Sequence, residues 1–252
     1  MKLAIIGSNG LEEVAKENSL TVKLTAKYKS KNTKIEKTFS AYDVNLSNGH
    51  LLYINRDSVG LFDGKSYFYP SEIDYKTIFV ALKQAGIKNV ISLSPAGSLE
   101  ETWKPSNVVL IRDFIDFVNR DIVLDDIGAD YVDMLEPFSN NLNNKILEAA
   151  KNLNFPIFDK GVYLMGINGV RFETNSEINL FKRISKENTL VGMITPTEAQ
   201  LCRLLDINYA NLSVIVNNFF SQKKVSHKDA EDAVNKTLPK VLKIVNTILP
   251  KL

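Results

Sequence analysis

The chain of 252 residues has very little of the chemistry that builds disulfides and metal centres. It contains one cysteine and two histidines, so no internal disulfide and no cysteine-built or multi-histidine metal site can form. Cys202 lies in the apolar, helix-compatible stretch AQLCRLL and is interpreted as a small buried side chain rather than a nucleophile. We therefore expect no metal and no cofactor, and any catalysis would use carboxylates, amides, hydroxyls and backbone groups.

An excess of charge of one sign and long apolar runs are also missing. The 31 lysines and arginines face 29 aspartates and glutamates, and a net charge of +2 is too small to predict nucleic-acid binding. No apolar run reaches the roughly 20 residues of a membrane span, and the start MKLAIIGSNGLEEV turns acidic after a short apolar segment. Hydrophobic residues make up 44% of the chain, as in globular proteins. We expect a folded cytoplasmic protein with neither nucleic acid nor membrane as a partner.

Short apolar runs that alternate with helical patterns predict the fold class. Strands are expected at 3–6, 20–28, 37–44, 50–55, 89–94, 107–115, 155–167, 189–193 and 210–218. Helical patterns follow at 71–86, 141–153, 174–186, 195–206 and 226–249, and 11–17 is also compatible with a helix. With no linker or repeat, residues 1–252 are predicted to form one α/β domain with a mixed, largely parallel central sheet flanked by helices.

Two of the helix starts carry a pattern typical of a capping box. Ser226 with Asp229 precedes the last helix, and Thr195 with Glu198 precedes the helix before it. Pro239 is expected to kink the last helix or to divide it.

Ligands bind at the carboxyl ends of strands in open α/β sheets, so the loops that leave those ends are the candidates for a site. Six loops qualify: 7–10, 55–60, 94–101, 168–177, 192–198 and 216–220. The residues alone give several of these stretches, and His227, an ordinary structural reading. The GSNG stretch is a strand-to-helix turn, Thr174 caps a helix beside a solvated Glu173, Asn218 ends a strand in a turn, and His227 lies at the surface.

Several stretches, taken together and in order, carry a resemblance to a known family. They are LAIIGSNGLEE, the block from SEIDYKTIF to LIRDFIDF, ADYVDMLEPFS, GVYLMGINGVRFETNSEINLFK, LVGMITPTEAQLCRLLDINYANLSVIVNN and VSHKDAEDAV. Over nearly its whole length the chain resembles the trimeric purine nucleoside phosphorylase and methylthioadenosine phosphorylase family. The resemblance implies cleavage of the N-glycosidic bond of a purine nucleoside with phosphate, giving free base and ribose 1-phosphate.

On the base side, the resemblance assigns three residues. Phe172 matches an aromatic that packs against the purine, and Glu173 matches the carboxylate that accepts from the ring N1–H of a 6-oxopurine. Asn218 matches the side chain that bonds N7 and O6 as the base departs. Glu173 and Asn218 are thus the expected catalytic residues, and the pair indicates a substrate such as inosine or guanosine.

On the sugar side, the resemblance places Met193 under the ribose and His227 at a free 5′-hydroxyl. An apolar residue would be expected at position 227 for a methylthio substituent, which makes methylthioadenosine the alternative substrate. Tyr131 matches a residue that closes the pocket of a neighbouring subunit. A homotrimer or homohexamer is therefore implied.

On the phosphate side, the chain departs from the family pattern. Arg56 matches a phosphate-binding arginine, but Asp57 follows it where the methylthioadenosine branch has histidine. Asn9 replaces a loop hydroxyl, and Ile194 replaces a serine or threonine. Next to Ala96, Pro95 replaces an alanine whose N–H donates to phosphate, and proline has no N–H.

These departures leave three functions open. The first is phosphorolysis, with phosphate as the co-substrate, at an unusual phosphate site. The second is hydrolysis, because an aspartate such as Asp57 can orient water. The third is a non-catalytic purine-binding homologue, in which Asp57 pairs with Arg56 or with a lysine and partly closes the anion site.

Overall fold

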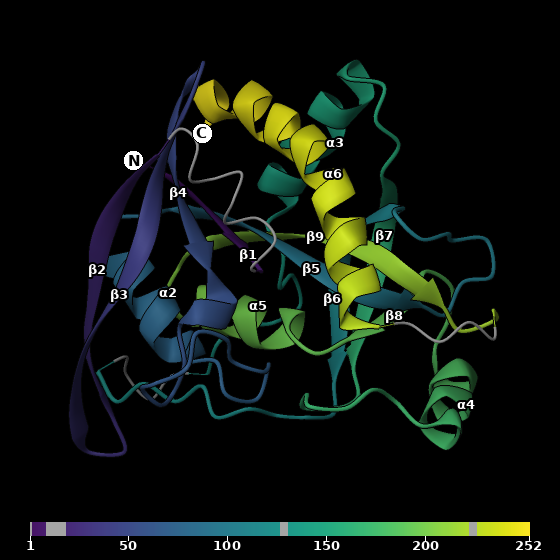
Figure 1. The fold of residues 1–252 in the computed structure, drawn as a ribbon, viewed down its shortest axis with the longest axis horizontal. Coiled ribbons are helices and arrows are strands. Elements are labelled where there is room, and N and C mark those ends of the chain that lie inside the picture. The colour runs from purple at the N-terminus through teal and green to yellow at the C-terminus, as the bar shows by residue number, and fades with distance from the viewer. Residues whose placement is uncertain (1, 9–18, 127–130, 222–225) are drawn as a thin grey trace.

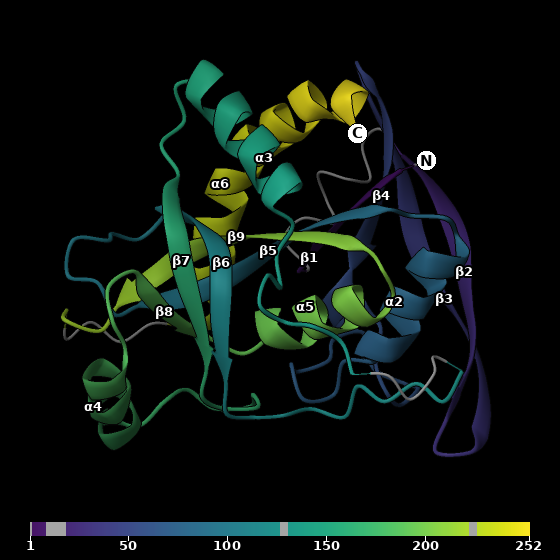
Figure 2. The same cartoon turned by 180° about the vertical axis from the view of Figure 1, so that it is seen from behind.

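The computed structural model describes residues 2–8, 19–126, 131–221 and 226–252, with the side chains of His227 and Glu231 left out. Its centre is one mixed sheet in the order β2-β3-β4-β1-β5-β8-β7-β6-β9, in which β5 also pairs with β9. The strands from β5 to β9 therefore form a closed ring, visible in Figures 1 and 2. The strands are β1 (Leu3–Gly7), β2 (Ser19–Ser30), β3 (Thr33–Leu46), β4 (Gly49–Asn55), β5 (Asn89–Ser98), β6 (Val108–Asp116), β7 (Phe158–Met165), β8 (Thr189–Gly192) and β9 (Asn208–Asn218).

The strand directions confirm the predicted fold class. The pairs β1–β4, β1–β5, β5–β9, β6–β7 and β7–β8 are parallel, whereas β2–β3, β3–β4, β5–β8 and β6–β9 are antiparallel. Strand β1 lies between β4 and β5 and is buried along its whole length. This agrees with its continuous apolar sequence, because a parallel strand is covered on both faces.

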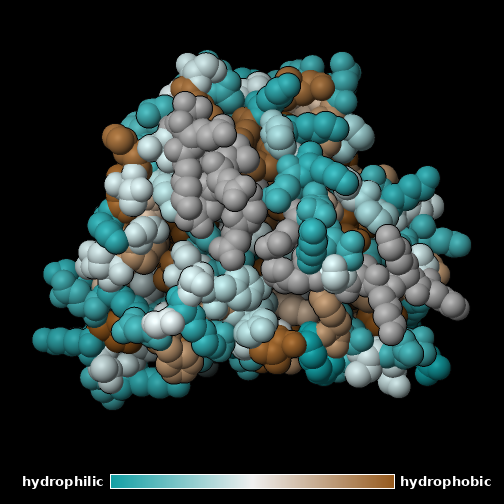
Figure 3. Space-filling model, viewed as in Figure 1, coloured by the Kyte–Doolittle hydropathy of each residue, from teal (hydrophilic) through white to brown (hydrophobic). Residues whose placement is uncertain are grey.

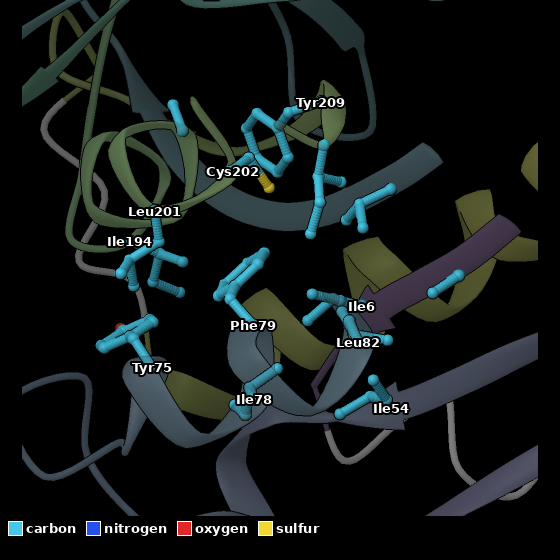
Figure 4. Close-up of a cluster of buried hydrophobic side chains, with 14 of the residues drawn as sticks. Ile6, Ile54, Tyr75, Ile78, Phe79, Leu82, Ile194, Leu201, Cys202 and Tyr209 are labelled. Atoms are coloured by element: carbon cyan, nitrogen blue, oxygen red, sulfur yellow. The ribbon is translucent and has the colours of Figure 1, made fainter. Parts of the chain in front are cut away.

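Helices cover both faces of the sheet, and each face has its own apolar core. Helices α2 and α5 lie on one face, and α3 and α6 lie on the other (Figures 1 and 2). Figure 4 shows part of the first core, in which Phe79 of α2 and Leu201 of α5 point toward each other. The helices are α2 (Tyr75–Gln84), α3 (Asn140–Asn152), α4 (Asn175–Ile184), α5 (Thr195–Leu204) and α6 (His227–Ile248), with 3₁₀ turns η2 (Arg56–Ser58) and η3 (Leu249–Lys251).

The helix starts agree with the sequence prediction at α6 and differ from it at α5. Ser226 and Asp229 form the predicted capping box of α6. The predicted pair of Thr195 and Glu198 is wrong, because the N-cap of α5 is Ile194 and has no side-chain hydrogen bond. Glu198 turns instead toward an arginine beneath the helix. Helix α6 also stays one element through Pro239, and Figure 1 shows its axis bending.

The described surface is ordinary for a folded domain. In Figure 3 hydrophilic residues cover most of the described surface on this side, with apolar residues in small groups between them. None of the described helices has both the length and the apolar character needed to cross a membrane. The described residues also contain no group of three or more His, Cys, Asp or Glu side chains placed to hold a metal ion.

Candidate functional site

The centre of the candidate site is the place where the parallel strands β1 and β4 end side by side, next to the middle of β5. Arg56 follows β4 directly, and its side chain is fully buried. Its Nη2 donates to the carbonyl oxygens of Ile6 and Leu93 at 3.1 and 2.9 Å and to Ser92 Oγ at 2.8 Å. The guanidinium therefore joins the carboxyl end of β1 to the middle of β5. It lies at the carboxyl ends of β1 and β4, and such ends are where ligands bind in this class of fold.

A buried carboxylate balances the charge of Arg56. Glu198 Oε1 lies 3.0 Å from Arg56 Nε, and Glu198 Oε2 accepts from the Tyr209 hydroxyl at 2.6 Å. Burial works to lower the pKa of Arg56, but the carboxylates of Glu198 and Asp57 outweigh it and raise that pKa. Sequence reasoning considered Asp57 as the partner of Arg56 and missed Glu198.

The ion pair leaves part of the guanidinium without a hydrogen bond. Nε and Glu198 Oε1 are within ion-pair distance, yet their alignment is not that of a hydrogen bond, and Nη1 has no partner among the described residues. A buried N–H without an acceptor costs about 1–3 kcal/mol. Nη1 is therefore the atom of this cluster that an oxygen of a bound anion would satisfy.

A second polar cluster lies beside Arg56 and was also missed. The fully buried Ser94 Oγ lies 3.3 Å from Thr195 Oγ1 and 3.2 Å from Ser213 Oγ, and it accepts from Asn211 Nδ2 at 3.1 Å. The signal was available, since these polar residues interrupt apolar strand runs, and buried polar groups are normally hydrogen-bonded.

Three further residues that the resemblance assigned to phosphate lie in β5 or in the apolar core. Pro95 is half-buried in β5 opposite Val214 of β9, and Ala96 is buried. Ile194 is only 7% exposed, and Figure 4 shows it in the apolar core beside Tyr75 and Leu201. Asn9 lies outside the described residues.

The loop after β7 presents Phe172 and Glu173. Phe172 is 59% exposed, whereas Glu173 is half-buried, and burial raises the pKa of its carboxyl. Thr174 and Glu177 form the capping box of α4 directly after them. The helix-capping role expected for Thr174 is thus confirmed. The neighbouring Glu173 was expected to be solvated, and it is instead half-buried.

Asn218 has its amide group engaged within the protein. Nδ2 donates to the carbonyl oxygens of Glu100, Glu101 and Trp103 at 2.7, 3.2 and 2.8 Å. Oδ1 accepts from the Phe220 N–H at 2.8 Å. In this arrangement the hydrogen bonds of Asn218 hold the end of β9 against the loop after β5. Its amide thus bonds to the protein rather than to a ligand.

The three residues that the resemblance assigned to the sugar side have different surroundings. Met193 is half-buried against the core of α2 and α5, and its carbonyl accepts from Arg120. Tyr131 is fully exposed. The side chain of His227 lies outside the described part of the chain, although its backbone begins α6.

A hollow of about 220 Å³ lies at the end of β9, and Arg56 is not among its lining residues. Asn217, Asn218, Asp229 and Lys236 are among its lining residues, and neither Arg56 nor Glu173 reaches it. The hollow therefore does not include the buried cation, and the candidate site is defined by the chemistry of Arg56 rather than by this hollow.

Phe219 fills the space in front of Gly97, on the strand that carries Pro95. A Cβ added at Gly97 would lie 2.5 and 2.6 Å from ring carbons of Phe219 and 2.8 Å from Asn217 Oδ1. We therefore expect Gly97→Ala to lower the free energy of unfolding by about 1–3 kcal/mol through overpacking, as measured by urea denaturation. Relative to Phe219→Ala alone, adding Gly97→Ala should cost much less. An equal cost in both backgrounds would show that Phe219 does not occupy this space.

The chain matches a family model and named relatives. The model described as the phosphorylase superfamily matches residues 2–250. An S-methyl-5′-thioadenosine phosphorylase of Pyrococcus furiosus is 31% identical over 73% of this chain and 72% of its own length. A probable 6-oxopurine nucleoside phosphorylase of Dictyoglomus turgidum is 31% identical over 73% of this chain and 70% of its own length.

Solved structures show the same fold. A methylthioadenosine phosphorylase from an Antarctic soil metagenomic library aligns with a TM-score of 0.78 at 23% identity, covering 99% of this chain and 85% of its own. The Schistosoma mansoni methylthioadenosine phosphorylase aligns with a TM-score of 0.77 at 20% identity, covering 98% and 90%. At these identities the structures support the fold, whereas the family follows from the sequence matches. The chain therefore belongs to the phosphorylase superfamily, within its purine nucleoside and methylthioadenosine phosphorylase family.

Proposed function

We propose that this protein cleaves the N-glycosidic bond of a 6-oxopurine nucleoside with phosphate as the second substrate. The observation that carries the proposal is the buried guanidinium of Arg56. It lies at the carboxyl ends of β1 and β4, its charge is balanced by Glu198, and its Nη1 has no hydrogen-bond partner in the described residues. Such a group is suited to hold an oxyanion beneath a sugar, because a buried donor is oriented before the reaction begins.

The reaction follows from placing phosphate at Arg56 and the purine at the loop after β7. A phosphate oxygen forms a bond to C1′ while the bond from C1′ to N9 breaks, and the bonding electrons pass to the purine. Positive charge develops on the sugar next to the anion, which stabilises the transition state more than the bound substrate. The purine takes up the proton that hydrogen phosphate loses as it becomes the ester, giving ribose 1-phosphate and free base.

The preference for a 6-oxopurine rests on Glu173. An ionised carboxylate accepts from the N1–H of inosine or guanosine, whereas adenosine has no hydrogen at N1. The other expected base contact, Asn218, has its amide bound to carbonyls of the loop after β5 and to the Phe220 N–H. In the 6-oxopurine proposal, Glu173 is therefore the discriminating group. The named relatives include both methylthioadenosine and 6-oxopurine nucleoside phosphorylases, so methylthioadenosine is the alternative substrate.

The raised pKa of Glu173 predicts a pH dependence of activity. The ionised form that accepts N1–H is lost as pH falls through the raised pKa, so kcat/KM for inosine should begin to fall at a higher pH than an ordinary glutamate would allow. Glu173→Gln should lower kcat/KM by about 10- to 100-fold, since a hydrogen bond to a charged group is worth about 1.5–3 kcal/mol. It should also remove the acid limb. An acid limb unchanged in Glu173→Gln would assign it to another group.

A specific pair of observations favours a second candidate, a homologue without catalytic activity. Phe219 occupies the space in front of Gly97, and the amide of Asn218 is bound within the protein. The resemblance assigns Asn218 to the base, and the protein's own carbonyl and N–H groups occupy its amide instead. The protein would then keep the family fold without turnover.

The deciding experiment measures base release from inosine, guanosine, adenosine and methylthioadenosine, with and without phosphate. Phosphate-dependent release from inosine or guanosine is the expected result, and release from methylthioadenosine alone would replace the 6-oxopurine preference. Release that does not depend on phosphate would replace phosphorolysis with hydrolysis. No release from any nucleoside would support the non-catalytic homologue.

The proposal includes assembly as a homotrimer or homohexamer in the cytoplasm. The exposed side chain of Tyr131 supports this, since the resemblance places it against the pocket of a neighbouring subunit. Sedimentation velocity measures the assembly directly, and a monomer at micromolar concentration would contradict it.

A further inference from the structure

The guanidinium of Arg120 connects two of the loops that carry the candidate site. Arg120 lies in the segment after β6, and its Nε donates to Asn168 Oδ1 at 2.7 Å while Nη2 donates to the Asn168 carbonyl at 3.0 Å. Its Nη1 donates to the Met193 carbonyl at 2.8 Å and to Thr197 Oγ1 at 3.1 Å. Figure 2 shows the chain leaving β6 and β7 at the same lower edge of the molecule, which brings these segments together.

The plane of this guanidinium is also held in place. Its central carbon lies 5.2 Å from the centre of the Tyr75 ring on α2, within the range of a cation–π contact. Because the guanidinium is planar and presents its donors in a rigid fork, fixing the plane fixes the directions of all its hydrogen bonds. The separation of the Asn168 and Met193 backbones is therefore set by one rigid group.

The Asn168 end of this connection leads directly into the loop at residues 166–174 after β7, which we call the base-side loop. Four residues after Asn168 the loop presents Phe172, and its far end is anchored by the Thr174 capping box. Between the two anchors Val170 has φ of +62°, which is strained for a β-branched residue. A strained segment keeps its shape only while its ends are held, so the anchor at Asn168 bears on where Phe172 and Glu173 lie.

The Met193 end of the connection leads to the turn at residues 193–194, which we call the sugar-side turn. Met193 lies in the turn between β8 and α5, and Thr197 is in the first turn of α5. Both acceptors are bound by the same nitrogen of Arg120, which therefore sets the turn relative to the helix. Arg56 and Ser94 receive no hydrogen bond from Arg120 within the described residues.

We propose that Arg120 is a positioning residue that holds the base-side loop and the sugar-side turn in one mutual geometry. This inference rests on the proposed function, in which Glu173 contacts the base of the nucleoside, and on the resemblance, which places Met193 under the ribose. Arg120 touches neither the substrate nor the phosphate. It acts through the Asn168 and Met193 backbones, and so it affects nucleoside recognition without affecting phosphate recognition.

The kinetic test compares Arg120→Met with a matched control, Arg112→Met. Arg112 makes a similar set of contacts, to Asp159 at 2.8 and 3.2 Å and to Asn140 at 3.0 Å, but these tie β6 to β7 and α3 rather than to the site loops. A displacement of about 1 Å at a reacting centre costs about 100-fold. We therefore expect Arg120→Met to lower kcat/KM for inosine by about 100-fold. The KM for phosphate should stay at the wild-type value, and Arg112→Met should resemble the wild type in both parameters.

Hydrogen exchange separates this inference from the proposed function. Arg120→Met should raise amide exchange in residues 166–174 and 192–195, and Arg112→Met should not. If the wild type releases no base, the proposed function fails, and the exchange result alone decides whether Arg120 holds the two loops. Unchanged exchange in Arg120→Met would overturn the inference. Where the wild type is active, raised exchange with kinetics no different from those of Arg112→Met would also overturn it, as would an equal loss of nucleoside and phosphate recognition.

Discussion

Glu198→Gln is expected to lower the free energy of unfolding by about 3–5 kcal/mol, because it removes one partner of a buried ion pair. Arg56 and Glu198 are both fully buried, and Glu198 Oε1 is 3.0 Å from Arg56 Nε. The glutamine would leave the guanidinium charge uncompensated, and the Tyr209 hydroxyl would lose an ionised acceptor at 2.6 Å. Urea denaturation measures the loss as a lower midpoint at an unchanged slope.

Two controls identify the uncompensated charge as the cause. The double variant Arg56→Met with Glu198→Leu removes both charges, and it should be more stable than Glu198→Gln, since replacing a whole buried pair by apolar residues is often close to neutral. Glu177→Gln breaks the surface pair with Arg171 and should cost much less than Glu198→Gln, because water solvates the remaining charge. Equal losses in Glu177→Gln and Glu198→Gln would refute the explanation.

Most of the fold was predictable because its strands and helices are specified by local patterns. The run NVISLS reads as a strand buried on both faces, and all six of its residues are buried in β5. The pair of Thr195 and Glu198 shows where a local pattern fails. Its spacing suits a capping box, yet Glu198 forms an ion pair with Arg56, which is far away in the sequence. Local spacing carries no information about such a partner.

The position of Arg56 directly after a strand was predictable from the sequence. The structure shows that its guanidinium there joins β1 and β5, and its role toward phosphate stays a prediction. The contacts of Asn218 with three carbonyls and of Phe219 with Gly97 were not predictable, because they depend on how the loop after β5 packs against the end of β9. The roles assigned to Glu173, Asn218 and Met193 stay predictions.

The second large effect is expected from restoring the phosphate side with Asp57→Asn and Pro95→Ala together. Asn is nearly isosteric with the buried Asp57 and removes a negative charge beside Arg56. A unit charge at about 4 Å is worth about 4 kcal/mol at an effective dielectric constant of 20. Alanine at position 95 restores a backbone N–H, and one oriented donor to an oxyanion is worth about 3 kcal/mol. We expect the KM for phosphate to fall by at least about 100-fold in phosphorolysis of inosine.

Ile194 is left unchanged in this variant because it packs in the apolar core beside Tyr75, where a serine would be buried at a cost in stability. The matched control is Asp113→Asn with Pro105→Ala, at two exposed positions away from Arg56, which should leave the KM for phosphate at the wild-type value. If the Asp57 and Pro95 variant folds with wild-type stability and its KM for phosphate does not change, phosphate does not bind at Arg56. The unpaired Nη1 would then have a structural role within the Arg56 and Glu198 cluster, and the non-catalytic homologue would gain support.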